Sequence, residues 1–298
     1  MPAERRQRLA LAALLAAAVA LGLVGALLIA PRLLSSAEAV GRIAFGSREG
    51  IFVVGSDGNG LRRLTSSWDD DPAWSPDGTK IAFTRVRNAL GQIYVMKADG
   101  SDVEQLTSGP FTNNHPSWSP NGTRIAFERD TSRRDGTVGI YVMDADGSRM
   151  RRLVSSRKFD FFPDWSPDGT RIAFQRGLAE IFVVNADGSG LRRVASAEAY
   201  RPVWSPDGTK LLFDGFRVFR GEPRTGIYAV NADGGSRRLL REGFAQAAWS
   251  PDGTRLAVFT VVAPDRGAIF VMDATGRGPA QLIADGSFAE NPDWEPSP

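Results

Sequence analysis

The hydrophobic and polar residues of this 298-residue chain follow two different patterns. An uncharged run of Leu, Ala, Val, Ile and Gly covers residues 9–30 and has no polar face. A run of this length is sufficient to cross a bilayer as a helix. From residue 40 onward the apolar residues instead come in short alternating segments such as QIYVMK, in which Ile93 and Val95 share one face. That alternation predicts many short β-strands.

The second pattern is periodic. A phrase that begins WSPDGT or WSPNGT occurs five times, and a shortened copy, WEPSP, ends the chain. The six tryptophans that open these copies are Trp74, Trp118, Trp165, Trp204, Trp249 and Trp294. A second phrase, typified by ADGS, alternates with the first and also occurs six times in related forms. Six copies of each phrase indicate six structural units, spaced by 39 to 47 residues.

Each unit is predicted to contain four strands. In Ser-Pro-Asp-Gly, proline presets the backbone for a turn, aspartate suits the next position, and glycine accepts the positive φ that closes a hairpin. This turn joins a strand that ends at the tryptophan to a strand such as TKIAF, and the ADGS turn joins the third strand to the fourth. Four strands per unit is typical of a propeller blade. The predicted fold is therefore an all-β, six-bladed β-propeller over residues 40–298.

The shortened last copy predicts how the ring of blades closes. After Trp294 the next strand should resemble TRIAF, and that string occurs at the other end of the domain as GRIAF, residues 41–45. We therefore expect the C-terminal strand to be the innermost strand of the blade whose other three strands are N-terminal. The six repeated tryptophans occupy one structural position, which predicts that they pack between blades.

The phrase WSPDGTKIAF, paired with VMDADGS and a following Leu-Thr, resembles the repeat of TolB-type six-bladed β-propellers, a family with a WD40-like PD repeat. The resemblance covers about residues 41–298. TolB proteins carry a separate α/β domain before the propeller, whereas here the repeats begin directly after the apolar segment. The resemblance implies the same six-bladed architecture that the repeat count predicts.

Residues 1–39 are predicted to be a basic cytoplasmic tail, a signal anchor or signal peptide, and a short linker. Three arginines precede the apolar run, which places the N-terminus in the cytoplasm and the propeller outside. Cleavage is the alternative to a retained anchor, because residues 37–39 form an A-x-A site. The predicted location is thus extracytoplasmic, either anchored in the cytoplasmic membrane or secreted after cleavage near Ala39.

Charge and composition narrow the classes of function. The net charge is +2, and residues 1–39 hold four arginines and two glutamates, so the propeller region is neutral and gives no indication of nucleic-acid binding. The absence of cysteine excludes disulfides and thiolate metal sites. The one histidine, His115, cannot build an imidazole-rich site, and no G-x-S-x-G motif occurs. We therefore assign no catalytic residue, metal or cofactor, and expect a monomeric propeller.

The segments that precede each innermost strand vary from unit to unit, unlike the tight turns. Because both tight turns of a blade lie at one end, these variable segments should surround the mouth of the central channel at the other end. Function in propellers is carried by such loops on a rigid scaffold. The predicted binding residues are Asp69, Asp70, Asp71, Asn114, His115, Asp160, Phe161, Phe162, Tyr200, Arg201, Gln246, Glu290 and Asn291.

Two main functions remain open at this point. The first is a binding or scaffolding propeller, with a protein or peptide partner over the channel mouth and membrane attachment through the N-terminal helix. The second is a small-molecule enzyme, a lyase or glycosidase, that uses carboxylates such as Asp70, Asp71, Asp160 and Glu290. A sensor would need a membrane partner as well, because the cytoplasmic tail is short.

Overall fold

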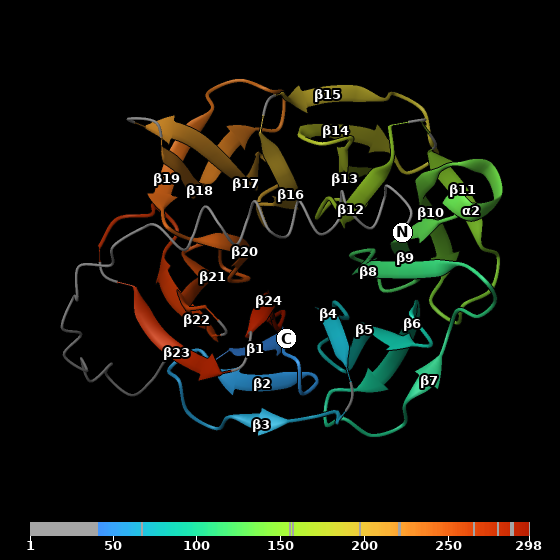
Figure 1. Cartoon of the computed structure of the whole chain (residues 1–298), viewed down its shortest axis with the longest axis horizontal. Coiled ribbons are helices and arrows are strands. Elements are labelled where there is room, and N and C mark those ends of the chain that lie inside the picture. The colour runs from blue at the N-terminus through green and yellow to red at the C-terminus, as the bar shows by residue number, and fades with distance from the viewer. Residues whose placement is uncertain are drawn as a thin grey trace.

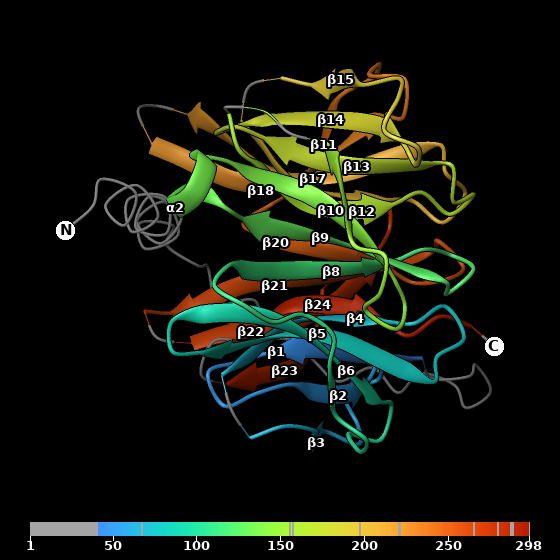
Figure 2. The same ribbon diagram turned by 90° about the vertical axis from the view of Figure 1, so that its right-hand side faces the viewer.

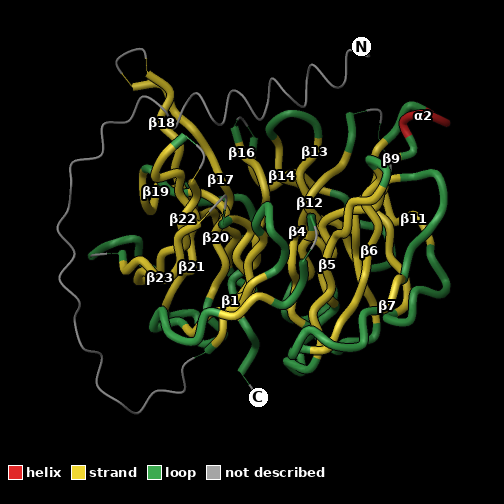
Figure 3. Tube along the Cα trace, turned by 60° about the horizontal axis from the view of Figure 1, so that its bottom comes forward, coloured by secondary structure: helices red, strands yellow, loops and turns green. Residues whose placement is uncertain are grey.

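The computed structural model describes residues 41–297, except residues 67, 155, 157, 197, 220, 221, 265, 279, 287 and 288. Six four-stranded antiparallel sheets surround a central channel like the blades of a propeller (Figure 1). We number the blades 1 to 6 along the chain, starting with the sheet that contains β1. A short helix, α2 (Ser132–Asp135), lies between two strands of blade 3 (Figure 3). The predicted all-β, six-bladed fold is confirmed.

The strands of each blade pair in sequence from the channel outward, and only blade 1 borrows a strand from the other end of the chain. The innermost strands of blades 1 to 6 are β24 (Glu290–Trp294), β4 (Asp69–Trp74), β8 (Thr112–Trp118), β12 (Asp160–Trp165), β16 (Ala199–Trp204) and β20 (Ala245–Trp249). The second strands are β1 (Arg42–Gly46), β5 (Lys80–Arg87), β9 (Arg124–Asp130), β13 (Arg171–Arg176), β17 (Lys210–Phe219) and β21 (Arg255–Ala263). The third strands are β2 (Phe52–Gly55), β6 (Leu90–Lys97), β10 (Val138–Asp144), β14 (Glu180–Asn185), β18 (Glu222–Asn231) and β22 (Arg266–Asp273). The outermost strands are β3 (Arg62–Arg63), β7 (Glu104–Gln105), β11 (Arg151–Val154), β15 (Arg192–Ala195), β19 (Arg238–Glu242) and β23 (Gln281–Gly286).

The C-terminal strand closes the ring in blade 1, which confirms the prediction from the shortened repeat. β24 pairs antiparallel with β1, with Trp294 opposite Ile43. Beyond this strand, the Glu295 N–H donates to the Arg42 carbonyl at 2.8 Å, and Arg42 Nε donates to Glu295 Oε2 at 2.8 Å. The first and last described strands therefore hold each other, and the inner edge of β1 is covered rather than open to another chain.

The two ends of the propeller have different structures. Every innermost strand begins at one end, which we call the mouth face, and runs toward the other, which we call the turn face. α2 lies at the mouth face and the C-terminus at the turn face (Figure 2). In the Ser-Pro-Asp-Gly turn of blade 2, the Gly78 N–H donates to the Ser75 carbonyl at 2.8 Å, and Gly78 has a φ of 66°. This is the predicted turn, in which glycine supplies the left-handed conformation.

The core of the molecule lies between neighbouring blades. Trp74 of blade 2 is 5% exposed and packs with Ala44, Ile51 and Val53 of blade 1. Five of the six repeated tryptophans are buried in this way, and Trp249 is partly buried against its own cluster. The predicted core position of the tryptophans is thus confirmed. Truncating such a side chain to alanine costs about 3–5 kcal/mol in protein cores.

Arginines of the outermost strands also join neighbouring blades. Arg151 Nη2 donates to the Ala186 carbonyl of the next blade at 2.8 Å, and Arg192 Nη2 donates to the Ala232 carbonyl at 2.6 Å. The charge of these arginines also keeps an outermost strand from pairing with another chain. In the structure these arginines in addition hold neighbouring blades together through hydrogen bonds.

The predicted membrane segment is not part of the described structure. No helix in residues 41–297, with the gaps given above, combines the length and apolar character needed to cross a membrane. The apolar run of residues 9–30, and all of the predicted region 1–39, lie outside the described residues.

Candidate functional site

Each innermost strand is interrupted by a β-bulge close to the mouth face. One residue in each bulge has a left-handed backbone, with φ between 50° and 53°. These six residues, which we call the mouth ring, are Asp71, His115, Phe162, Arg201, Gln246 and Asn291. All six are among the binding residues predicted from sequence, whereas the bulge that presents them was not predicted.

The backbone of the mouth ring is strained. A left-handed conformation costs about 1–2 kcal/mol at a residue with a side chain. In five of the six blades the next residue is proline, which favours an extended conformation in the residue before it. Glycine would adopt the left-handed backbone without this cost, yet none of the six is glycine. Strain of this kind clusters at functional sites, and its repetition in all six blades makes the ring the candidate site of this propeller.

Neighbouring blades support the strained backbone. The His115 N–H donates to Thr84 Oγ1 at 3.2 Å, and the Gln246 N–H donates to Asp214 Oδ1 at 2.7 Å. The Asn291 N–H donates to Gln246 Oε1 at 2.8 Å. In all three pairs the acceptor lies on the preceding blade. At these three positions the preceding blade therefore supports the ring backbone, whereas the Asp71 N–H donates to Asp70 Oδ1 of its own strand at 2.8 Å.

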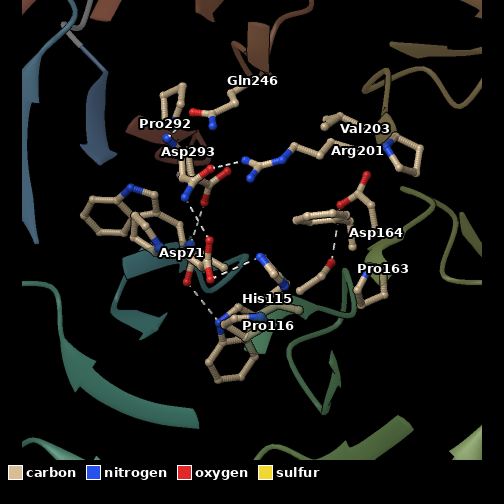
Figure 4. A pocket seen from close by; sticks show the side chains of 18 of the residues that line it. Asp71, His115, Pro116, Pro163, Asp164, Arg201, Val203, Gln246, Pro292 and Asp293 are labelled. Carbon is tan, nitrogen blue, oxygen red and sulfur yellow. Dashed lines mark hydrogen bonds and ion pairs between the residues drawn. The ribbon is translucent and has the colours of Figure 1, made fainter. Parts of the chain in front are cut away.

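The mouth ring forms one end of a cavity of about 280 Å³ in the channel (Figure 4). Below the ring, the wall contains the prolines that follow the ring residues, together with Trp74 and Trp118. Asp164 and Asp293 also line the wall, and Pro76 of a turn-face hairpin is its farthest member from the mouth. The cavity therefore combines apolar surface with carboxyl groups.

A chain of polar contacts connects the ring side chains (Figure 4). His115 Nδ1 lies 2.9 Å from Glu128 Oε2, and His115 Nε2 lies 3.4 Å from Asp71 Oδ2. Asn291 Nδ2 donates to Asp71 Oδ1 at 2.9 Å, and Asn291 Oδ1 accepts a hydrogen bond from Arg201 Nη1. Because Arg201 belongs to blade 5 and Asn291 to blade 1, the Arg201 side chain passes blade 6 and extends across the mouth.

Aromatic rings line the mouth on the side of blades 4 and 5. The ring of Phe162 lies 4.2 Å from the imidazole of His115, and the guanidinium carbon of Arg201 lies 4.5 Å from the centre of the Phe162 ring. Phe161 packs against Phe162 at 6.3 Å between ring centres. Tyr200 stacks on a phenylalanine of its own blade. Phe161 and Phe162 thus form a partly exposed aromatic pair at the mouth, and Tyr200 forms a second stacked pair on blade 5.

Carboxyl groups line the mouth on the opposite side, at blades 1 and 2. Asp70 Oδ1 accepts a hydrogen bond of 3.0 Å from Asn291 Nδ2. Burial, reinforced by the charges of Asp71 and Glu290, raises the pKa of Asp70 to about 8. Burial also raises the pKa of Glu290. Asp70 is therefore mainly protonated at neutral pH.

His115 lies between two of these carboxyl groups. Burial acts to lower the pKa of His115, but the charges of Asp71 and Glu128 outweigh burial, so its pKa is raised. The imidazole therefore accepts a proton more readily than a free histidine. In its protonated form it can pair with the carboxylate on either side.

Two carboxyl groups of the cavity wall were missed by sequence reasoning. Asp164 Oδ2 accepts the Trp204 N–H at 2.7 Å, and Asp293 Oδ2 accepts the Trp74 N–H at 2.6 Å, so each joins its blade to the next one. Burial raises the pKa of each group to about 7. A signal was available, because each aspartate lies two positions after a ring residue, and side chains two apart on a strand share a face.

The other predicted residues lie behind the ring. Asp69 is held by Arg85 through hydrogen bonds of 2.7 and 2.6 Å, and Asp160 by Arg176 through hydrogen bonds of 2.6 and 2.9 Å. Both aspartates are fully buried, do not line the cavity, and join the first strand of their blade to the second. Asn114 packs against a glycine of blade 2. These side chains support the mouth from outside the channel.

The fold and site together define a six-bladed β-propeller whose channel mouth carries a ring of six side chains, each of a different residue type. The sequence model of the family named TolB β-propeller domain matches residues 38–134 and 108–298 of this chain. The chain therefore belongs to this family, and the resemblance seen in the repeats is confirmed.

Solved structures share the architecture. The crystal structure of TolB from Acinetobacter baumannii is 23% identical with a TM-score of 0.73, over 86% of this chain and 67% of that one. A putative TolB from Agrobacterium tumefaciens is 20% identical with a TM-score of 0.66, over 86% and 92%. An oligogalacturonate lyase from Vibrio parahaemolyticus is 14% identical with a TM-score of 0.54, over 78% and 70%. At these identities the likeness shows the fold.

The mouth is equipped for non-covalent recognition. It offers a guanidinium, an imidazole, amide groups, carboxyl groups and aromatic faces within one rigid ring. In the described part of the chain, no group of three or more histidine, aspartate or glutamate side chains is arranged to hold a metal ion. Carboxyl groups with pKa values near neutral are the ones suited to proton transfer.

Proposed function

We propose that this chain is an extracytoplasmic propeller of the TolB family that binds a protein or peptide partner over its mouth face. The observation that carries the proposal is the mouth ring. Six blades repeat one strained backbone there, yet no two of them present the same residue. At the turn face, the blades repeat both the backbone and the residues. Variable side chains on a repeated, rigid framework are typical of a binding surface.

The packing of the ring favours tight recognition. Its side chains are held by one another and by neighbouring blades, so they can meet a ligand with little loss of conformational freedom, and such preorganisation improves affinity. Beside the ring, Trp68 is 68% exposed and directly precedes β4 at the mouth face. Tryptophan is enriched among the residues that dominate binding energy in interfaces. Trp68 is therefore a suitable anchor at the edge of the docking area.

We further propose that residues 1–39 attach the propeller to the outer side of the cytoplasmic membrane, or are removed near Ala39. The support is the sequence of this region, with arginines before an apolar run. Membrane fractionation combined with N-terminal sequencing of the purified chain separates the two outcomes. An unprocessed chain that stays in the soluble fraction would contradict both.

The docking proposal is tested by site-specific photocrosslinking in cells that produce the full chain. A benzophenone amino acid at Trp68 or Phe161 is expected to trap a partner, because both positions are on the mouth face. The same amino acid at Leu191, which is exposed on the turn face, is the matched control and should trap none. Asp71→Asn is expected to weaken the mouth crosslinks. Identical products from both faces, or none from the mouth, would contradict the proposal.

One observation favours a second function, that of a lyase or glycosidase. Asp164 and Asp293 line the cavity with pKa values of about 7, as acid–base catalysis at neutral pH requires. The test is incubation of the full chain with oligogalacturonate, the class of substrate in the name of the lyase structure, followed by measurement of cleavage products. Turnover that is lost in Asp164→Asn would support the enzyme. Its absence in the wild type would exclude this substrate.

A further inference from the structure

The mouth already holds one cationic group, which belongs to the chain itself. The guanidinium of Arg201 lies 4.5 Å from the Phe162 ring on blade 4 and donates to Asn291 Oδ1 on blade 1. Blades 4 and 1 face each other across the channel (Figure 1). The guanidinium is therefore suspended over the channel rather than against the wall of its own blade (Figure 4).

The groups around this guanidinium are mainly acidic. The charge of Arg201 acts on Glu290 and on Asp214, and Arg201 reaches Asp71 through the amide of Asn291. The mouth thus provides an aromatic face, an amide oxygen and carboxyl groups around one point. This combination is the one that recognises guanidinium and ammonium groups in proteins.

The carboxyl groups deeper in the cavity lack a cation. Asp164 accepts hydrogen bonds from Ser117 Oγ and the Trp204 N–H, and Asp293 accepts one from the Trp74 N–H. Among the described residues, no lysine, arginine or histidine forms an ion pair with either aspartate. Each of the two carboxyl groups therefore lacks a compensating charge, and a positive group placed in the cavity would favour its ionised form.

We propose that the partner of the mouth face inserts an arginine or lysine side chain into the mouth, and that Arg201 occupies this place in the free protein. The inference rests on the proposed docking function and names the chemistry that docking uses. Arg201 itself shows that a guanidinium fits between Phe162 and Asn291. An acidic partner group would be the opposite choice, but it would enter beside Asp71 and above Asp164 and Asp293 and would disfavour the ionised form of each of them.

The experiment is chemical rescue of the full-length protein. Replacing Arg201 by alanine removes the guanidinium from its position between Phe162 and Asn291. Arginine amide is then added as the probe, and thermal unfolding is followed by tryptophan fluorescence. Arg201→Ala is expected to lower the melting temperature, and arginine amide is expected to restore part of it. The probe should bind the variant about tenfold or more tightly than the wild type, since it meets no resident guanidinium there.

Matched controls separate a built site from general effects of the probe. Citrulline amide has nearly the same shape as arginine amide but a neutral side chain, and it should not restore stability. Arg171→Ala removes a guanidinium that lies 4.6 Å from the Trp204 ring, toward the turn face, and should not respond to arginine amide. Adding Asp71→Asn to Arg201→Ala should abolish the rescue. If the alanine variant does not fold, Arg201→Gln keeps most of the side-chain length and serves in its place.

Several outcomes would overturn the inference. These are equal rescue by citrulline amide, equal rescue of Arg171→Ala, and an absence of tighter binding in both Arg201 variants. Binding of glutamate amide to the wild type that is lost in Arg201→Ala would instead make Arg201 a receptor for an acidic group. Photocrosslinks from the mouth face without any arginine rescue would leave the docking function standing and refute only the cationic partner group.

Discussion

Aspartate has opposite environments in two regions of this molecule. In the hairpins of the turn face, Asp168 and Asp207 each accept a hydrogen bond from a serine of the same turn. This bond is the main reason that the pKa of each aspartate is lowered to about 2. In the channel, burial raises the pKa of Asp70 to about 8 and that of Asp164 and Asp293 to about 7. The charged form of aspartate is therefore stabilised by hydrogen bonds at the turn face and destabilised by burial in the channel.

The difference separates a region in which aspartate stabilises the fold from a region in which charged aspartate opposes folding. A turn carboxylate stabilises the hairpin that contains it, so its presence follows from folding alone. A buried carboxyl group with a raised pKa opposes folding in its charged form, and such groups cluster at functional sites. The strained backbone of the mouth ring points in the same direction. This contrast supports the proposal that the turn face is the framework of the propeller and that the channel mouth binds the partner.

The largest expected effect comes from removing the strand that serves both regions. β24 supplies Asn291 to the mouth ring and Trp294 to the core, and deletion of residues 289–298 removes both and uncovers the edge of β1. We expect the deletion variant to unfold or aggregate because an open strand edge pairs with other chains. Size-exclusion chromatography and circular dichroism check this. A soluble variant with a cooperative melting transition would contradict it.

The second effect is a dependence of stability on pH that has opposite signs in the two regions. For Asp164 and Asp293 the folded pKa lies above the unfolded value, so their favourable contribution is complete below about pH 4 and is lost as pH rises through 7. Replacing both with asparagine should therefore make the variant gain stability relative to the wild type between pH 4 and 8, by up to about 4 kcal/mol per aspartate. Denaturant unfolding at a series of pH values measures the difference.

The turn-face control for this profile replaces Asp168 and Asp207 with asparagine. Their folded pKa values are lowered, so their contribution is present above about pH 4 and is lost as pH falls toward 2. This variant should be less stable than the wild type at neutral pH and approach it only in acid. Profiles of the same sign for both variants would remove the contrast between the two regions.

A smaller effect is expected from one turn carboxylate. Asp207 Oδ1 accepts hydrogen bonds from Ser205 Oγ at 2.6 Å, the Thr209 N–H at 3.0 Å and Thr209 Oγ1 at 2.8 Å. Asp207→Ala should lower the free energy of unfolding by about 1–3 kcal/mol, because these donors lose their acceptor. Photocrosslinking from the mouth face should be unchanged, and its loss would show that the two regions are not independent.

The smallest effect is expected at the ion pair that accompanies ring closure. Arg42 and Glu295 are partly exposed, and their side chains pair beside Trp294 at the turn face. Glu295→Gln should cost about 1 kcal/mol or less, because water screens such pairs. Urea unfolding measures the change. A loss close to that of the strand deletion would mean that the pair, rather than the strand, closes the ring.

Much of the candidate site could be predicted because the repeats align the mouth positions of all blades. The alignment identified every member of the mouth ring, but it could not separate these residues from Asp69 and Asp160, which are bound to arginines behind the ring. It also missed Asp164 and Asp293, since their Pro-Asp-Trp context matches a core position in other blades. The local sequence predicts how far along its strand a residue lies, but it does not predict which other side chains that residue contacts.

The sequence by itself determined the number of blades, the turns between strands and the closure of blade 1. These features depend on neighbouring residues, through strand alternation, turn chemistry and a shortened repeat. The tertiary structure alone decided which side chains meet over the channel. Asn291 lies 90 residues from Arg201 and 220 residues from Asp71 in the sequence. The three side chains come together only when the ring of blades is complete. Their contacts are set by packing between blades, which no local pattern encodes.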